Sequence, residues 1–399
     1  MASVSKREWT HKGETKSAWI VRYFDAKRRH CQKTFEKKKD ADKFRLKVEI
    51  ELEKNRHISS TDERTVNAIC EAFLRSIEDR LEDGRMGRGT QKNYKISIEK
   101  GVIPYFGKMK INEITFAHVE GFYKEMIKNR GLHPTTARMR LTKFRNVCQF
   151  AIKRGAMAQE PVTAFLQDLR GAKETTVRTF TQDELVRLLK QLEIKRRHQR
   201  ERCHLRLKCY VHLAVFCGLR FGEISGLTLP CINIDDRVVH VRHSLTDFDE
   251  LKAPKTRAGV RDVPMPSHVA NLLSEWLQQF AVGNERGLIF RQKSGTMHSP
   301  SNFHRGDWRP LLRLSGLLAD GEEVLHFHAL RHFAASWWIS QGIGMMEVAS
   351  LLGHRTFNTT LQTYAHPVIG GHRRREMTDL AAIQLLPPPA LDLKPTHVQ

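Results

Sequence analysis

The spacing of hydrophobic residues divides the chain into segments, and the first segment has a period of two. Within SAWIVRYF, the side chains of Trp19, Val21 and Tyr23 fall on one face, while Ile20 and Phe24 fall on the other. This alternation is typical of a β-strand. HCQKTFE, which follows the turn sequence DAKRR, predicts a second strand, and REWTHKG predicts a third. The beginning of the chain therefore predicts a small three-stranded sheet.

A helical period replaces the alternation after residue 36. Four apolar side chains recur on one helical face between residues 37 and 56: Ala41, Phe44, Val48 and Leu52. Three strands and one helix make a compact β-β-β-α domain, which we place at residues 1–56. The polar residues 57–64 predict a linker.

Helical spacing then continues from residue 65 to about residue 170. Four apolar residues mark the first helix: Val66, Ile69, Phe73 and Ile77. Further helical segments follow at 84–107, after a glycine-rich basic turn, and at 115–130 and 134–155. Helices joined by short connections predict a helical bundle over residues 65–170. The polar stretch GAKETTVRTF predicts a second linker.

Strand and helix patterns are mixed over residues 178–385. Thr181 lies three residues before Glu184 and ahead of an apolar run, which predicts a capping box at a helix start. RVVHVRHSL and RDVPM predict strands, and five stretches predict helices: 203–218, 267–280, 328–341, 344–352 and 357–364. The proline-rich residues 386–399 predict a flexible tail. The expected fold class is multidomain and mainly α with small β-sheets, and its last large domain is mixed α+β.

The charge of the chain narrows the classes of partner. Its 399 residues carry a formal net charge of +23, and the first 60 residues contain 17 Lys and Arg against 9 Asp and Glu. A chain this basic usually binds a polyanion, most often nucleic acid, and a membrane surface is the alternative. The sequence shows no apolar run near 18 residues, no signal peptide and no lipidation motif. We therefore expect a cytoplasmic protein with no membrane partner, associated with the nucleoid when it binds DNA.

The cysteines give no indication of a metal or of disulfides. The seven cysteines are an odd number, lack a C-x-x-C motif and lie mostly among apolar neighbours, as reduced core cysteines do. Cys203, His204, Cys209 and His212 are close in sequence, but their spacing fits no standard zinc pattern. We expect no metal site.

Basic residues in the first two domains are candidates for contacts with DNA. A two- or three-stranded ribbon fits the major groove, and lysines and arginines on helix faces suit phosphate contacts. The candidates are Arg22, Lys27, Arg28, Arg29, Lys33, Lys92, Lys95, Arg138, Arg140 and Lys143. A solvated basic surface without a ligand is the alternative explanation for such charge runs.

Four short motifs in the last domain carry the candidate chemistry. CGLRFGEISGL contains Arg220 and Glu223, and APKTRAGVRDVP contains Lys255. FHALRHFAASWW contains His328, Arg331 and His332, and LLGHRTFNTTLQTYAH contains His354 and Tyr364. Each motif alone has an ordinary structural explanation, such as a surface ion pair or a helix-end packing residue. Their occurrence together and in this order does not.

The four motifs together resemble those of the tyrosine recombinase family, also called phage integrases. The resemblance is clear over roughly residues 180–370, and the N-terminal domains match only in pattern. It implies an arm-type DNA-binding domain, a helical core-binding domain and a catalytic domain, the last two forming a C-shaped clamp around duplex DNA. It also implies a site-specific recombinase that integrates or excises a mobile element such as a prophage or an integrative element. Implied partners are double-stranded DNA at attachment sites, three further copies of the chain in a tetramer, a DNA-bending host protein and an excisionase.

The resemblance assigns a chemical role to each motif residue. Tyr364 would attack phosphorus and form a 3′-phosphotyrosyl link, which stores the energy of the broken phosphodiester, so no metal or other cofactor is needed. Arg220 and Arg331 would hold the non-bridging phosphate oxygens with their planar guanidinium groups. Four further residues would assist: Lys255 would protonate the departing 5′ oxygen, His328 would assist proton removal from Tyr364, His354 would hydrogen-bond the phosphate, and Glu223 would orient His328 or an arginine. His332 would provide structural support.

Two other functions stay open from the sequence. A type IB topoisomerase uses the same kind of active site to relax supercoils, although the separate basic N-terminal domain argues against it. A DNA-binding regulator without catalysis would need none of the motif residues, yet every catalytic position is filled.

Overall fold

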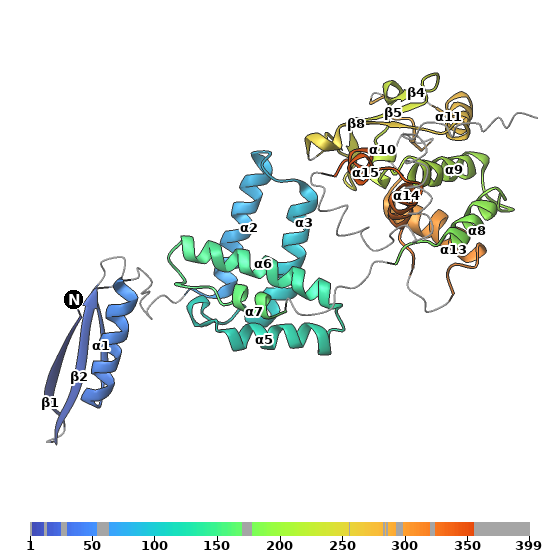
Figure 1. The fold of residues 1–399 in the computed structure, drawn as a ribbon. Helices are drawn as coiled ribbons and strands as arrows, with labels where there is room; N and C mark the ends of the chain where they lie inside the picture. The colour runs from blue at the N-terminus through green and yellow to red at the C-terminus, as the bar shows by residue number, and fades with distance from the viewer. Residues whose placement is uncertain are drawn as a thin grey trace, which may run out of the picture. The chain divides into compact units, whose positions relative to one another are not determined.

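The computed structural model describes residues 2–11, 14–24, 30–53, 64–169, 178–254, 256–281, 284, 286–292, 298–319 and 324–354 (Figure 1). The chain divides into two compact units, residues 1–175 and 176–399. The first unit contains two separate hydrophobic cores, one in its β-sheet part (residues 2–53) and one in its helical part (residues 64–169). The finer bounds 1–56, 65–170, 178–385 and 386–399 stay predictions.

The β-sheet part has the predicted β-β-β-α order. Strands β1 (Ser3–His11), β2 (Glu14–Phe24) and β3 (His30–Phe35) form an antiparallel sheet with β2 in the middle, and helix α1 (Lys38–Glu53) follows. The alternation in β2 has the predicted effect, because Val21 and Tyr23 are buried in a core that α1 completes with Ala41 and Val48. The other face of the sheet carries exposed side chains such as Arg22.

The helical part is built from α2 (Val66–Glu82), α3 (Arg88–Ser97), α4 (Ile103–Phe106), α5 (Phe116–Lys124), α6 (Pro134–Lys153) and α7 (Val162–Asp168). The four apolar residues that predicted α2 are all buried in the core, and Thr65 caps the helix by accepting a hydrogen bond from Ala68 N. A π-helical turn, Ile98–Val102, joins α3 to α4. Only α7 lacks a counterpart among the predicted helices.

The second unit is mixed α+β. Its helices are α8 (Gln182–Leu192), α9 (Glu201–Phe216), α10 (Phe221–Ser225), α11 (Ser267–Phe280), α12 (Pro300–Phe303), α13 (Arg309–Leu314), α14 (Ala329–Ser340) and α15 (Met345–Leu352). The capping box predicted for α8 is present, since Thr181 and Glu184 each bond the backbone of the other. Helix α9 is largely buried and contacts α10, α11 and α14. The helix predicted at 357–364 lies outside the described residues.

The strands of this unit correct one prediction. RVVHVRHSL forms two strands, β5 (Val238–Val241) and β6 (Ser244–Leu245). Strand β5 lies between β4 (Ile232–Asn233) and β8 (Arg261–Pro264), whereas β6 pairs with β7 (Leu251–Lys252) in a separate hairpin. Local alternation shows that a strand forms but does not show where it changes partner.

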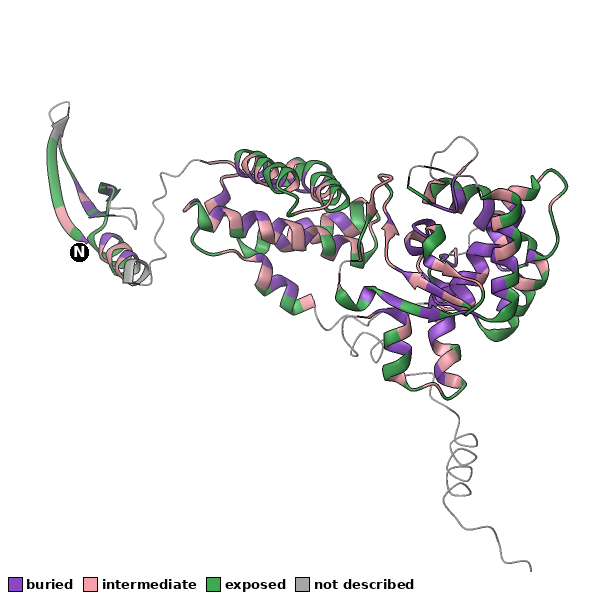
Figure 2. Ribbon diagram, turned by 90° about the horizontal axis from the view of Figure 1, so that it is seen from above, coloured by how far each residue is buried: buried purple, intermediate pink, exposed green. Residues whose placement is uncertain are grey.

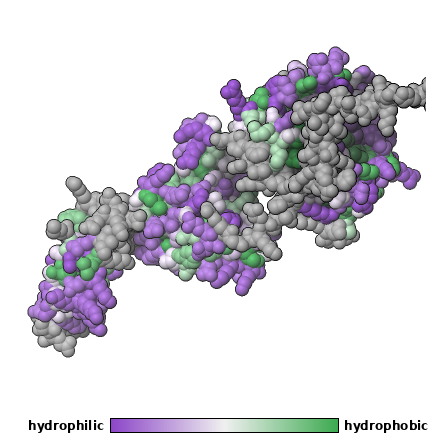
Figure 3. Space-filling model, in the orientation of Figure 1, coloured by the Kyte–Doolittle hydropathy of each residue, from purple (hydrophilic) through white to green (hydrophobic). Residues whose placement is uncertain are grey.

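Burial follows these elements in both units. Figure 2 shows buried residues on the inward faces of the helices and strands, and the coloured residues on the face seen in Figure 3 are mainly hydrophilic. No helix in the described part of the chain is both long and apolar enough to cross a membrane. The predicted fold class, multidomain and mainly α with small sheets, is confirmed.

Candidate active site

A tight turn after α9 places the first motif. Gly218 has a left-handed backbone with φ of +62°, and a Cβ there would lie 2.9 Å from the Trp338 ring and 3.0 Å from Leu352. Glycine therefore allows α9 to end directly against α14 and α15. The turn leads into Arg220, which is the N-cap residue of α10, and Glu223 follows in the first turn of that helix.

Glu223 lies at the centre of a cluster of arginines. Its carboxylate accepts hydrogen bonds from the Arg220 backbone N at 2.9 Å and from Arg220 Nη1 at 2.7 Å. Arg261 of β8 donates Nη1 to Oε1 at 3.1 Å and Nη2 to Oε2 at 2.9 Å. Arg331 Nη1 lies 3.7 Å from Oε2. Three cations surround one carboxylate, so the cluster keeps an excess of positive charge.

The arginines hold Glu223 in its ionised form. Burial by itself would raise the pKa of this carboxyl group, but the hydrogen bonds and charge of Arg261 and the charges of Arg331 and Arg220 outweigh it and lower the pKa to about 2. The hydrogen bonds described for its carboxylate come from Arg220 and Arg261. That Glu223 orients His328 or an arginine for the reaction stays a prediction.

Arg331 is the most deeply buried of the three arginines in the cluster. Only 1% of the residue is exposed, and it donates Nη1 to Gly218 O at 2.6 Å and Nη2 to Leu352 O. By contrast, 40% of the Arg220 side chain is exposed. Arg331 thus ties the end of α9 to the end of α15, and Arg220 presents its guanidinium group to the outside.

His354 is brought to the same cluster by the end of α15. Gly353 has φ of +66°, and a Cβ there would lie 2.8 Å from Ala258 O and 3.0 Å from Arg261 Nη1. Arg261 also donates Nε to Leu351 O at 2.6 Å. Desolvation, followed by the charges of Arg331, Arg220, Arg261 and His332, lowers the pKa of His354 to about 4. His354 is therefore neutral near pH 7.

His328 and His332 lie together at the start of α14. Their rings are 4.8 Å apart and nearly perpendicular. Although His328 is exposed as a residue, desolvation of its ring and the charges of His332, Arg331 and Arg220, opposed by Glu223, lower its pKa to about 4. A neutral imidazole can accept a proton, which suits the base role predicted for His328.

Two predicted site residues lie outside the described residues, Lys255 and Tyr364. The structure brings the other six into one region of the second unit: Arg220, Glu223, His328, Arg331, His332 and His354. Each has an electrostatic or hydrogen-bond connection to another member of this set. The region combines buried and exposed guanidinium groups with neutral imidazoles, which is an arrangement suited to a phosphate group.

Arg261 belongs to this site, and the sequence reasoning missed it. It is 8% exposed and contacts Glu223, Leu351 and Gly259. A signal was present, since alternation in GVRDVPM places Arg261 on the same strand face as Val263 and Met265. An arginine among buried apolar residues needs an anionic partner in the interior.

The candidate DNA-contact residues of the sheet do not share one face. Strand pairing places Lys33 opposite Val21 on the face covered by α1, and its ammonium lies 4.9 Å from the Phe44 ring centre. Arg22 lies on the opposite face, where it donates to Ser5 Oγ at 3.1 Å. Lys27, Arg28 and Arg29 lie outside the described residues.

The candidates of the helical part gather on α3 and α6, which contact each other. Lys92 and Lys95 are exposed on α3, and Arg138, Arg140 and Lys143 are half-buried on α6. Lys143 Nζ lies 4.1 Å from the centre of the Tyr94 ring of α3. The structure therefore brings these five cations to two neighbouring helices.

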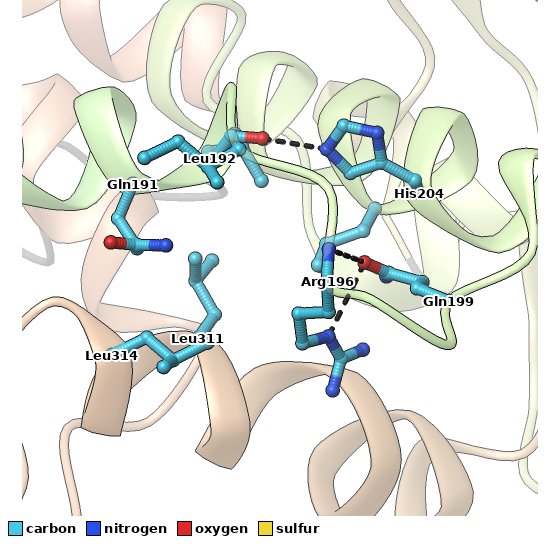
Figure 4. A pocket seen from close by; sticks show the side chains of 9 residues that line it. Gln191, Leu192, Arg196, Gln199, His204, Leu311 and Leu314 are labelled. Atoms are coloured by element: carbon cyan, nitrogen blue, oxygen red, sulfur yellow. Dashed lines mark hydrogen bonds between the residues drawn. The ribbon is translucent and has the colours of Figure 1, made fainter.

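The cysteine and histidine cluster lies in the second unit, and the two ring nitrogens of His212 are buried without a hydrogen-bond partner among the described residues. His204, from the cysteine and histidine cluster, is hydrogen-bonded to Leu192 O at 2.8 Å. Figure 4 shows this bond beside a small pocket, where Gln199 Oε1 accepts from Arg196. None of the predicted catalytic residues lines this pocket. Within the described ranges, no three His, Cys, Asp or Glu side chains are grouped so that they could hold a metal ion.

Comparison with known families identifies the chain. Residues 178–369 match the model of the Phage integrase family, and residues 79–127 match the phage integrase N-terminal SAM-like domain. The chain belongs to the phage integrase family of tyrosine recombinases. The predicted resemblance and the predicted enzyme class, which cuts and rejoins DNA strands, are thereby confirmed.

Curated relatives of this tyrosine recombinase carry the same family name. A XerC-like tyrosine recombinase of Caldanaerobacter subterraneus subsp. tengcongensis is 25% identical over 287 residues, which cover 65% of this chain and 69% of the relative. Tyrosine recombinase XerC of Mycobacterium bovis is 27% identical over 242 residues, which cover 60% of this chain and 74% of the relative.

Solved structures share the fold of this tyrosine recombinase. The Tn1549 transposon integrase in complex with transposon right end DNA has a TM-score of 0.64 at 20% identity, covering 80% of this chain and all of that chain. A lambda integrase dimer bound to a COC′ core site has a TM-score of 0.58 at 18% identity, covering 75% and 95% of the two chains. At these identities the likeness concerns the fold.

Proposed function

We propose that this tyrosine recombinase integrates or excises a mobile DNA element, with Tyr364 as nucleophile and the arginine cluster around Glu223 as its phosphate site. One observation carries the proposal: Arg220, Arg261 and Arg331 surround a single buried carboxylate, and His328 and His354 lie beside them in the neutral form. A scissile phosphodiester brings the negative charge that this excess of cations attracts.

The residues of the site divide the reaction between them. The Tyr364 oxygen bonds to phosphorus as the bond from phosphorus to the 5′ oxygen breaks, which leaves a 3′-phosphotyrosyl link. His328 takes the proton of the tyrosine, and Lys255 gives a proton to the 5′ oxygen. Arg220, Arg331 and His354 stabilise the charge that develops on the non-bridging oxygens. Glu223 and Arg261 hold the arginines in place, and His332 supports His328.

The partners belong to the same proposal. Double-stranded DNA at attachment sites is the substrate, the chain acts as a homotetramer, and a DNA-bending host protein and an excisionase set the direction of recombination. Support comes from the fold relatives, which include a lambda integrase tetramer bound to a Holliday junction with a TM-score of 0.56. The net charge of +23 supports a polyanionic partner as well.

The decisive experiment replaces the nucleophile. Tyr364→Phe removes one hydroxyl group, so DNA binding is expected to persist while covalent cleavage is lost. The full chain is incubated with a nicked attachment-site duplex and analysed on a denaturing gel. Tyr105→Phe, a partly exposed tyrosine of the helical part, is the matched control and keeps the covalent band. A covalent band with the Tyr364 variant would disprove the assignment.

Plasmid relaxation and the covalent-complex assay together separate the alternatives. A topoisomerase relaxes a plasmid that lacks any attachment site, whereas the proposed recombinase needs paired sites. A regulator without catalysis forms no covalent complex with the wild-type chain.

The arginine assignment has its own test. Arg331→Lys keeps the charge, but a lysine cannot reproduce the planar fork that reaches both Gly218 O and Leu352 O. Loss of one transition-state donor slows cleavage about 100- to 1000-fold, while binding changes less because other phosphate contacts remain. If the variant cleaved at the wild-type rate in a single turnover, Arg331 would not contribute to the phosphate site.

A further inference from the structure

The hairpin β6–β7 leads directly to Lys255, the proposed general acid. Only two residues of each strand are paired, Ser244 with Lys252 and Leu245 with Leu251. A two-stranded hairpin of this size has little stability of its own. Its position therefore depends on contacts with the rest of the second unit.

One end of the hairpin rests on α10. A Cβ at Gly222 would lie 2.7 Å from Ser244 Oγ, and a Cβ at Gly226 would lie 2.9 Å from Leu245 N. The two glycines let β6 lie directly on the helix that carries Glu223. This contact fixes the incoming strand but leaves the tip of the hairpin to other residues.

The tip is held through Asp249. The turn closes with hydrogen bonds from Thr246 N to Glu250 O at 2.9 Å and from Asp249 N to Thr246 O at 3.0 Å. Asp249 has φ of +58°, a conformation that non-glycine residues rarely adopt. Arg291 Nη1 donates to Asp249 Oδ2 at 3.1 Å and lies 3.0 Å from Oδ1. Arg286 Nη1 donates to Asp249 O at 2.6 Å.

Arg291 comes from a segment that is anchored in the core. The residue is only 6% exposed, and its carbonyl oxygen accepts from Arg202 Nη2 at 2.7 Å. Two residues earlier, Ile289 O accepts from Trp276 Nε1 at 3.1 Å and Ile289 N donates to Leu227 O at 3.0 Å. The guanidinium group thus reaches the hairpin from a rigid base.

We propose that the ion pair between Asp249 and Arg291 positions the general acid. Both are positioning residues, since they act on the reaction through the hairpin and Lys255. Separating a buried guanidinium group from its carboxylate leaves an uncompensated charge in the interior, which costs free energy. The pair therefore holds the tip of the hairpin in one position. The inference rests on the proposed function, in which Lys255 protonates the 5′ oxygen as the bond from phosphorus to that oxygen breaks.

A substrate with a better leaving group tests this role. In a 5′-bridging phosphorothiolate duplex, sulfur replaces the scissile 5′ oxygen, and the Tyr364 oxygen displaces a thiolate. A thiol has a pKa near 8.5, far below that of an alcohol, so the sulfur leaves without a proton from the enzyme. Variants that lack only the general acid therefore recover on this substrate, whereas variants with a damaged phosphate site or fold do not.

The experiment compares single-turnover cleavage of the two duplexes by the full chain. Asp249→Asn keeps the shape of the side chain and tolerates the positive φ. Arg291→Gln removes the buried positive charge, while Arg286, whose Nη1 lies 3.4 Å from Asp249 Oδ1, remains. Each variant is expected to cleave the ordinary duplex about 10- to 100-fold more slowly, a partial loss of the roughly 100- to 10,000-fold that general acid catalysis supplies. On the phosphorothiolate duplex, where the leaving group needs no proton from the enzyme, each variant should cleave within about threefold of the wild-type rate. Lys255→Ala should show the same recovery.

Two comparisons make the result interpretable. Asp262→Asn removes an exposed carboxylate of β8 and should leave both rates unchanged. Arg291→Lys keeps the charge and should recover part of the ordinary rate. If Lys255→Ala recovers on sulfur but the Asp249 and Arg291 variants do not, or if they cleave the ordinary duplex normally, the positioning role is wrong. If Lys255→Ala itself fails to recover, the proposed general acid is wrong and the inference falls with it.

Discussion

Glu223 and Arg261 are joined in the interior of the second unit by two hydrogen bonds of 3.1 and 2.9 Å. Glu223 is 4% exposed and also binds Arg220, and Arg261 also binds Leu351 O. This pair connects strand β8 to α10 and to the end of α15. The geometry of the proposed phosphate site therefore depends on a pair of residues that lie behind its surface.

Removing the charge of Glu223 is expected to destabilise the unit. Glu223→Gln keeps the size of the side chain but leaves Arg261 and Arg331 without a counter-charge in the interior. Loss of one partner of a buried pair costs about 3–5 kcal/mol of unfolding free energy. Urea unfolding measures this loss, and cleavage should fall as well. Glu275→Gln, on the exposed side of α11, is the control and should change neither. Unchanged stability of the Glu223 variant would contradict a central role for this carboxylate.

Acidification is expected to weaken the fold in two steps. The pKa of His328 and of His354 is about 4 in the folded chain, below the ordinary 6.5, so the unfolded chain binds more protons between these values. Their contribution to stability is complete above pH 6.5 and is lost as the pH falls toward 4. The pKa of Glu223 is about 2 against 4.5, so its contribution is complete above pH 4.5 and is lost as the pH falls toward 2.

Urea midpoints of the full chain from pH 7 to pH 3 measure this dependence. The double variant His328→Asn, His354→Asn should show a smaller decrease between pH 6.5 and pH 4 than wild type. An identical decrease in both proteins would assign the effect to other groups.

Gly353 is expected to tolerate no side chain. In Gly353→Ala, the new Cβ would lie 2.8 Å from Ala258 O, and the residue would also keep the unfavourable φ of +66°. Gly131→Ala is a matched control, because Gly131 has φ of +59° but nothing within 4 Å of its Cβ position. The control should lose about 1–2 kcal/mol from backbone strain alone. The Gly353 variant should lose more and should cleave poorly, and equal losses would show that the close contact with Ala258 O is unimportant.

The two faces of the N-terminal sheet are expected to differ in DNA binding. Arg22 lies on the open face and Lys33 lies over Phe44 on the helix-covered face. If the open face contacts phosphates, Arg22→Ala reduces the slope of log binding constant against log salt concentration by about 1, and Lys33→Ala leaves it unchanged. Binding is measured by anisotropy with an arm-site duplex. The reverse pattern would place the DNA on the helix side.

Deleting residues 1–60 is expected to separate cleavage from recombination. Cleavage of a short core-site duplex should survive, because the second unit has its own core. Recombination of a full attachment site should fail, since the second, tethered DNA contact is lost. Normal recombination by the shortened chain would show that the N-terminal domain is dispensable.

The order of the motifs and the local periods could be predicted from the sequence because they depend on neighbours along the chain. The period of two in SAWIVRYF, the helical spacing of Val66, Ile69, Phe73 and Ile77, and the capping box of Thr181 and Glu184 all act within a few residues. The four recombinase motifs were equally readable, because each is a short string and their joint occurrence identifies the family.

Only the tertiary structure decided which distant residues meet. The separation of Arg22 from Lys33 depends on the register that pairs Val21 with Lys33, and no local pattern specifies that register. The short helices α7, α12 and α13 were not predicted, since helices of this length are stable only when packing supports them. Arg261 became a site residue because Glu223, 38 positions away, lies within hydrogen-bonding distance in the folded chain. A buried charge must find its partner in three dimensions, so the residues that hold the phosphate site together were determined by packing rather than by their sequence neighbours.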